Sequence, residues 1–179
     1  RLTELHMFID KYPYNYHYLG FIAKAFPDAR IIYLKRNPMD ACFAMFKQSF
    51  FKFAYSLEDL GKYYVAQDAL RNHWRSILGD RLVEVDYESL VNMQESSTQW
   101  ILSKLGLVFE PACLEIVKNP TSSATASTLQ VSENLHTRSV DKWKHFAVEL
   151  APLKHFHNHS GLNTKWLTIY YSHLRQRLT

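Results

Sequence analysis

Apolar residues recur along the chain at two spacings, and these predict alternating strands and helices. Residues 31–34 form a continuous β-branched and aromatic run between turn signals at Pro27 and Pro38, which is typical of a buried strand. Residues 82–87 form a second run of this kind. Apolar residues three and four positions apart predict helices over residues 14–26 and 57–78. This order predicts an α/β domain with a parallel sheet flanked by helices.

Polar residues mark where further predicted helices begin. Asn37 can cap a helix over residues 38–50, and Asp40 suits its first turn. Ser56 and Asp59 have the spacing of a capping box at the start of the long helix predicted over residues 57–78. Further helices are predicted over residues 94–105, ended by Gly106, and over residues 111–117.

The chain is predicted to be one compact unit with a tail. We place the main domain at residues 1–162 and a C-terminal helical tail at residues 163–179. The tail has apolar residues at helical spacing, which could pack on the core, form a dimer contact or lie on a membrane surface. Residues 120–132 are rich in Ser and Thr and are expected to form a loop.

Composition narrows the class of protein without naming a function. The chain has 179 residues, 47% of them hydrophobic, so it can bury the core of one domain. A net charge of +4 fits an anionic ligand but is too small and too scattered to favour nucleic acid. Cys42 and Cys113 lie far apart, which predicts a reducing compartment, the cytoplasm. No apolar run approaches the roughly 20 residues that a transmembrane helix needs.

Arg36 stands at the end of the first predicted strand, and this position favours an anionic ligand. In open α/β sheets, ligands bind beyond the carboxyl ends of the strands. A guanidinium held there offers a planar donor fork to a phosphate or a sulfate. The alternative is a purely structural ion pair between Arg36 and Asp40.

Five segments, taken together and in order, carry a family likeness. They are residues 9–15, 27–40 with Arg36-Asn37-Pro38, 57–64, 85–91 with Asp86-Tyr87-Glu88, and 125–143. In this order they resemble sulfotransferases that use 3′-phosphoadenosine-5′-phosphosulfate (PAPS), most closely the bacterial tetratricopeptide-linked and tyrosylprotein branch. The resemblance implies a P-loop-NTPase-like three-layer fold, PAPS as the sulfuryl donor, 3′,5′-adenosine bisphosphate as the product, a hydroxyl acceptor and no metal.

The resemblance also implies a loop that this chain lacks. The family binds the 5′-phosphosulfate with a Ser- and Gly-containing turn, whose backbone amides cradle the group at a helix N-terminus. The five glycines of this chain are isolated, and none follows an apolar strand with the required small residues. We therefore expect a C-terminal portion of the domain, with the phosphosulfate loop and the general base upstream of Arg1.

The resemblance places nucleotide contacts at particular residues of the predicted domain. Arg36 matches the family arginine that binds the 3′-phosphate. Ala44 stands where the family normally has a serine that donates a hydroxyl to the same phosphate, so weaker nucleotide binding is expected. Tyr87 matches a tyrosine near the nucleotide, with a half-buried strand aromatic as the alternative.

A second set of contacts is implied in a mobile loop that closes over the nucleotide. Ser127 and Lys142 match a serine and a lysine of that loop. Asp141 stands where the family usually has glycine, which puts an acid beside a phosphate site unless Arg138 neutralises it.

Lys11 is the residue to which the resemblance assigns chemistry. It lies two residues before Pro13, where the tyrosylprotein-like branch has a lysine. Sulfuryl transfer builds negative charge on the departing phosphate oxygen, and an ammonium stabilises that charge. A lysine near its ordinary pKa is a poor base, so we assign Lys11 to the leaving group, with a solvated surface lysine as the alternative.

The resemblance therefore implies a portion of a sulfotransferase that acts on a hydroxyl group. The nearest branch suggests a protein tyrosine as the acceptor, and carbohydrate or small-molecule hydroxyls are the next candidates. The alternative is a non-catalytic binding fragment in which Ala44 and Asp141 record lost activity. The alternating His155, His157 and His159 are not expected to bind a metal, because a helix would scatter them. Cys42 is expected to be a packed thiol rather than a nucleophile.

Overall fold

The computed structural model describes residues 8–48, 52–115 and 137–158. Short 3-10 turns connect its helices and strands, and two of these turns, Thr137–Ser139 and Lys142–Phe146, lead into the last helix. The helices and strands are α1 (Leu19–Ala25), β1 (Ile31–Lys35), α2 (Pro38–Gln48), α3 (Leu57–Leu78), β2 (Leu82–Asp86), α4 (Tyr87–Asn92), α5 (Gln94–Leu105) and α7 (Ala151–Asn158).

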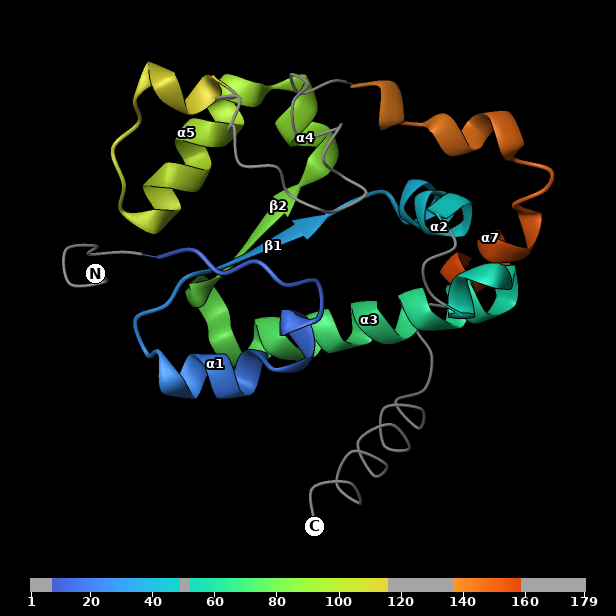
Figure 1. Cartoon of the computed structure of the whole chain (residues 1–179), viewed down its shortest axis with the longest axis horizontal. Helices are drawn as coiled ribbons and strands as arrows, with labels where there is room; N and C mark the ends of the chain where they lie inside the picture. The colour runs from blue at the N-terminus through green and yellow to red at the C-terminus, as the bar shows by residue number, and fades with distance from the viewer. Residues whose placement is uncertain (1–7, 49–51, 116–136, 159–179) are drawn as a thin grey trace, which may run out of the picture.

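The two strands form a parallel sheet that separates two layers of helices. β1 pairs with β2 in a register that sets Ile31 opposite Leu82 and Lys35 opposite Asp86. Helices α1 and α3 lie on one side of the sheet, and α4 and α5 lie on the other (Figure 1). The prediction of an α/β fold with a parallel sheet flanked by helices is confirmed.

Local capping explains where the helices begin. The Asn37 side-chain oxygen accepts a hydrogen bond from the Met39 N–H at 2.9 Å, so Asn37 caps α2 as predicted. The Ser56 hydroxyl accepts one from the Asp59 N–H at 3.2 Å and starts α3. Gly106 ends α5 with a φ of 72°, a left-handed conformation that glycine adopts without strain.

Three predicted elements differ from the structure. The helix expected over residues 14–26 is divided at Tyr18 into a 3-10 turn and α1. Tyr87 does not end a strand, because it is the first residue of α4, a helix that we did not predict. The short helix expected from residue 111 is a 3-10 turn, Pro111–Leu114. The expected 120–132 loop and the 163–179 tail lie outside the described residues.

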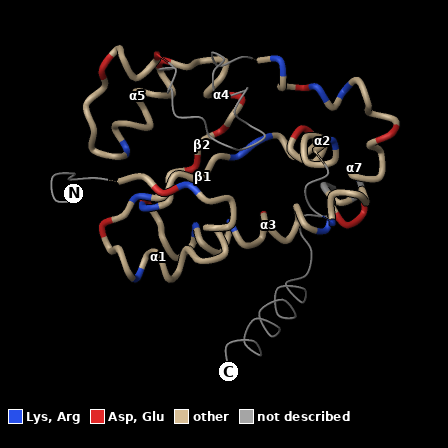
Figure 2. Tube along the Cα trace, in the orientation of Figure 1, with Lys and Arg blue, Asp and Glu red and all other residues tan. Residues whose placement is uncertain are grey.

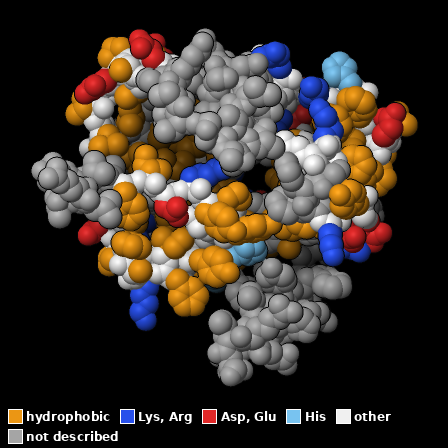
Figure 3. Space-filling model, viewed as in Figure 1, with side chains coloured by type: hydrophobic (Ala, Val, Ile, Leu, Met, Phe, Trp, Pro, Cys, Tyr) orange, Lys and Arg blue, Asp and Glu red, His pale blue; other side chains and the backbone are white. Residues whose placement is uncertain are grey.

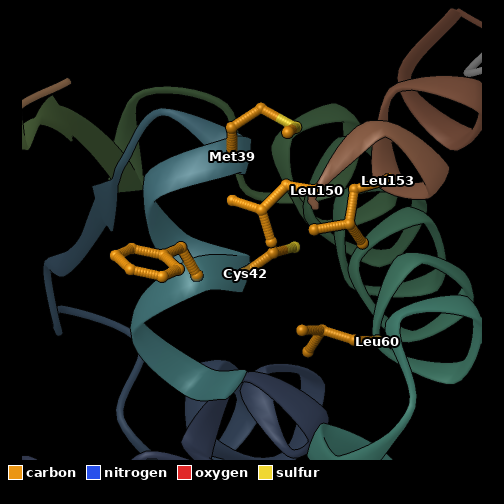
Figure 4. Close-up of a cluster of buried hydrophobic side chains, with 6 residues drawn as sticks. Met39, Cys42, Leu60, Leu150 and Leu153 are labelled. Carbon is orange, nitrogen blue, oxygen red and sulfur yellow. The ribbon is translucent and has the colours of Figure 1, made fainter. Parts of the chain in front are cut away.

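Two buried hydrophobic clusters hold these elements together. One joins α2, α3 and α7 and is drawn in Figure 4; its buried members are Met39, Cys42, Phe43, Leu60, Leu150 and Leu153. The other joins α1, the end of α3 and the sheet through Leu19, Leu78 and Leu82. Because α2 begins next to the end of β1, the first cluster fixes the helix that follows Arg36.

One face of β1 is uncovered within the described residues. Ile32 and Leu34 are 48% and 54% exposed, although their partners in register, Val83 and Val85, are buried. Hydrophobic side chains also gather over α1 on the face of the molecule that Figure 3 shows. Phe21 of α1 is among the exposed large hydrophobic residues. The described helices therefore leave the face of β1 that carries Ile32 and Leu34 partly uncovered.

Candidate functional site

The turn from β1 into α2 positions Arg36. β1 ends at Lys35, and the side-chain cap of Asn37 starts α2 two residues later. The Asn37 N–H donates to the Glu88 side chain at 2.8 Å, which ties the turn to α4. Basic residues lie where β1 runs into α2, as Figure 2 shows in blue. Arg36 is thus held at the carboxyl end of a parallel strand, where α/β folds place ligands.

The Arg36 guanidinium is held by groups that leave its charge unneutralised. Its Nη2 donates to the Ser139 carbonyl oxygen at 2.6 Å, and its Cζ lies 5.1 Å from the centre of the Tyr87 ring. Its Nε is buried and has no hydrogen-bond partner among the described residues. Within the same residues no carboxylate pairs with it, so the alternative of an Arg36–Asp40 ion pair is not observed.

Asp40 has a different partner, the backbone of the segment that contacts Arg36. One carboxylate oxygen accepts from the Asp141 N–H at 2.7 Å and the other from the Trp143 N–H at 3.0 Å. The Trp143 side chain packs against the cluster around α2 and α7. The segment 139–143 is therefore fixed across the start of α2, more than a hundred residues away in sequence.

Asp141 has a left-handed backbone conformation, which suits the glycine that the resembling sulfotransferases usually have at this position. Its φ is 58°, and Asp is one of the few residues besides glycine that adopt this region readily. Its carboxylate accepts from the Lys144 Nζ at 2.6 Å. Lys144 thus forms an ion pair with this acid, a partner that the sequence analysis did not consider.

The structure brings some predicted site residues together and leaves others apart. Tyr87 lies against Arg36, and Lys142 is exposed three residues after Ser139. Ala44 is half-buried on α2, where it does not line the pocket beside Arg36. Ser127 lies outside the described residues.

Lys11 is exposed in the segment that precedes α1. The segment is held in place because the Asn15 side chain donates to Asp10 at 2.7 Å, and the Trp74 indole N–H donates to the Tyr16 carbonyl at 2.8 Å. Lys11 does not line the pocket in which Arg36 lies. The pairing of these two residues in one active site stays a prediction.

A pocket of about 390 Å³ lies beside Arg36, between the end of β1 and α3. Its lining includes the charged residues Lys35, Arg36, Asp68, Arg71, Asp86 and Glu88. Most of these charges are paired: Lys35 with Asp86 at 3.1 Å, and Arg71 with Asp68 at 2.8 Å and with Glu84. Arg36 is therefore the lining cation that lacks a carboxylate partner among the described residues.

Sequence reasoning missed the pocket's paired charges. Asp68 and Arg71 are three positions apart on α3, and Glu84 and Asp86 alternate on β2, so these spacings were the available signal.

The same pocket includes Tyr33, whose hydroxyl accepts from Gln67 at 3.2 Å. Burial raises the pKa of Tyr33 to about 12, so this phenol stays protonated at neutral pH.

Other predicted features have plain structural explanations. Burial raises the pKa of the Cys42 thiol to about 12, which disfavours the thiolate and agrees with a packed thiol. His155 and His157 lie on α7, and His159 lies outside the described residues. In the described part of the chain, no three His, Cys, Asp or Glu residues gather as a metal site would need. None of its helices is both long enough and apolar enough to cross a membrane.

Comparison with known sequences identifies the family of this chain. A sequence model of the sulfotransferase family matches residues 3–111. An uncharacterized protein of Aquifex aeolicus (strain VF5) is 31% identical over 151 residues, which are 81% of this chain and 20% of that protein. This chain thus spans about a fifth of the length of that curated relative. Because the family match covers more than half of the chain and includes β1, α2 and the turn between them, the chain belongs to the sulfotransferase family.

Proposed function

We propose that this chain is the C-terminal part of a sulfotransferase domain that transfers a sulfuryl group from PAPS to a hydroxyl acceptor. The proposed acceptor is a protein tyrosine, with carbohydrate or small-molecule hydroxyls as further candidates. The phosphosulfate loop and the general base are proposed to lie outside residues 1–179, because the glycines of this chain are isolated from one another. In support, the chain spans only a fifth of the length of its Aquifex relative.

The proposal rests on one observation, the unpaired hydrogen-bond donor of the Arg36 side chain. Its Nε is buried without a partner among the described residues, and a buried unpaired donor is costly unless something accepts from it. A phosphate oxygen is such an acceptor, and it would also neutralise a guanidinium that forms no ion pair with a carboxylate of the described residues. We therefore assign Arg36 to the 3′-phosphate of the nucleotide, with Tyr87 beside it and Ser127 and Lys142 in the covering loop.

The proposed reaction forms one bond and breaks one bond at sulfur. The acceptor oxygen bonds to the sulfur atom, the bond from sulfur to the 5′-phosphate oxygen breaks, and the acceptor proton passes to a base. The charge left on the 5′-phosphate needs a nearby cation, and we assign this role to the Lys11 ammonium. The hydrogen bond from Asn15 to Asp10 supports this role, because it restrains the backbone on both sides of Lys11.

Calorimetric titration tests the nucleotide assignment on the chain as it stands. Arg36→Ala should weaken binding of 3′,5′-adenosine bisphosphate by roughly 10- to 150-fold, the equivalent of about 1.5–3 kcal/mol for a charged hydrogen bond. Binding of adenosine 5′-monophosphate should change little, because it lacks the 3′-phosphate. Arg30→Ala is the matched control, since Arg30 is exposed at the opposite end of β1. Equal losses for both nucleotides would refute the assignment.

A fusion tests the catalytic part of the proposal. The chain joined to the matching upstream segment of a related enzyme should transfer sulfate from PAPS to a tyrosine peptide, whereas the chain alone should show little turnover. Lys11→Ala in the fusion should lower kcat by roughly 10²–10³, with a smaller effect on nucleotide affinity. Lys24→Ala, an exposed lysine on α1, is the control.

The second candidate function is a binding module without catalysis. Two observations favour it: Ala44 has no hydroxyl to offer, and the Asp141 carboxylate lies in the segment that contacts Arg36. A fusion that binds the bisphosphate but remains inactive would support this candidate. Robust turnover by the isolated chain would contradict both the proposed missing segment and the binding module.

A further inference from the structure

Asp40 is a buried acid whose two oxygens serve a distant segment. Its residue is 1% exposed, and each oxygen accepts a separate backbone N–H, from Asp141 at 2.7 Å and from Trp143 at 3.0 Å. Buried carboxylates are retained only where hydrogen bonds replace the lost water. In this protein both hydrogen bonds come from the backbone of one short segment, residues 141–143.

The start of α2 does not need this carboxylate for its own cap. The Asn37 side chain already accepts from the Met39 N–H and, at 3.4 Å, from the Asp40 N–H. The positive end of the helix favours an acid at this position, but that would hold for an exposed acid as well. The burial of Asp40 and its two bonds therefore point to a role in the segment 139–143.

Arg36 and Asp40 together hold three backbone groups of that segment, one from every second residue. Arg36 donates to the Ser139 carbonyl, and Asp40 accepts from the N–H groups of Asp141 and Trp143. The Ser139 carbonyl in turn occupies one arm of the Arg36 fork at 2.6 Å. A shift of the segment would therefore change the direction in which the remaining N–H groups of Arg36 point.

We propose that Asp40 is a positioning residue for the 3′-phosphate site. It fixes the segment 139–143 against the Arg36 guanidinium and thereby sets the orientation of that guanidinium, without itself contacting the ligand. This inference rests on the proposed function of Arg36. Loss of the Asp40 carboxylate should therefore reduce recognition of the 3′-phosphate, although the Asp40 side chain is buried and does not touch the ligand.

Asp40→Asn tests the inference in the full chain. An asparagine of the same size keeps one acceptor but presents an NH₂ group to the other N–H, so the tether is half lost. We expect amide hydrogen exchange to rise about tenfold in peptides covering residues 137–146, with little change in β1 and α3. Affinity for 3′,5′-adenosine bisphosphate should fall about tenfold, and affinity for adenosine 5′-monophosphate should not. Asp59→Asn, an exposed acid in the first turn of α3, is the matched control.

Each outcome separates this inference from the proposed function. If the unmodified chain binds no bisphosphate, the proposed function fails, while hydrogen exchange still reports whether Asp40 holds the segment. If Asp40→Asn frees the segment but leaves the selectivity between the two nucleotides unchanged, the positioning role is overturned. Unchanged exchange in the segment overturns it too.

A measurement on the unmodified chain covers the case in which the variant does not fold. Saturating bisphosphate should slow hydrogen exchange within residues 137–146, and saturating adenosine 5′-monophosphate should not. Equal protection by both nucleotides, or none by the bisphosphate when it binds, would contradict the coupling between this segment and Arg36.

Discussion

Removing the charge of Asp141 should strengthen nucleotide binding without disturbing the backbone. Asp141→Asn is the cleanest change, because asparagine also tolerates the φ of 58° found at this residue. The variant loses an ion pair with Lys144 whose two side chains are more than half exposed, and such pairs contribute about 0–1 kcal/mol to stability. The free energy of unfolding should therefore change by less than about 1 kcal/mol.

The gain in affinity can be worked from the geometry. Asp141 lies two residues from Ser139, whose carbonyl contacts Arg36, so its carboxylate lies roughly 10 Å from a phosphate held there. At that distance a carboxylate and a doubly charged phosphate repel by about 0.8 kcal/mol in water, which is about fourfold in affinity. The ion pair with Lys144 and ordinary salt reduce this value. We expect Asp141→Asn to bind the bisphosphate about two- to fourfold more tightly at low salt.

Calorimetry at low and high salt measures this effect, and three variants isolate its cause. Asp141→Gly should give the same gain as Asp141→Asn, since both remove the charge and both accept the backbone conformation. Asp141→Ala should instead lower stability by about 1–2 kcal/mol, because alanine is strained at positive φ. Glu95→Gln, an exposed acid on α5, controls for net charge. If Asp141→Asn binds the bisphosphate no more tightly than the unmodified chain at low salt, the charge argument is refuted.

Three further predictions concern packing, ionisation and the missing hydroxyl. Gly61→Ala would place a Cβ in steric overlap with the Phe156 ring, so overpacking of about 1–3 kcal/mol should outweigh a helix gain of about 1 kcal/mol. Chemical denaturation should show the loss, and Phe156→Leu should relieve it. Burial raises the pKa of Cys42 from 9.0 to about 12, so the unfolded chain releases this proton first and stability falls as the pH rises through that window. Cys42→Ala should flatten this fall by up to roughly 1.4 kcal/mol per pH unit in urea unfolding, and an unchanged slope would contradict it. Ala44→Ser should tighten binding of the bisphosphate by up to roughly tenfold in calorimetry; weaker binding by a folded variant would count against the register drawn from the resemblance.

The features that were predicted correctly from the sequence depend on residues that are close together in the chain. Asn37 and Ser56 cap their helices because a side-chain oxygen reaches an N–H two or three residues ahead, and this can be read from spacing alone. The end of α3 at Leu78 follows from a different local signal, the helical spacing of apolar residues, which stops there. Arg36 at the end of β1 follows from an apolar run and the turn after it.

The features that the sequence did not reveal depend on distant partners. Tyr87 is an aromatic residue after a strand, and nothing local shows that it starts α4 once the pairing with β1 ends at Asp86. The role of Asp40 depends on N–H groups that follow it by more than a hundred residues. Such contacts are set by the packing of Trp143 into the core around α2, which spacing does not encode.

The open face of β1 has a consequence for handling the protein in solution. A parallel strand with apolar residues on both faces is typical of the interior of a sheet, and Ile32 and Leu34 leave such a surface in contact with water. Exposed apolar patches of this kind favour association between copies of a protein. We expect the purified chain to scatter light increasingly with concentration, and Ile32→Lys, which puts a charge on that face, to keep it monodisperse.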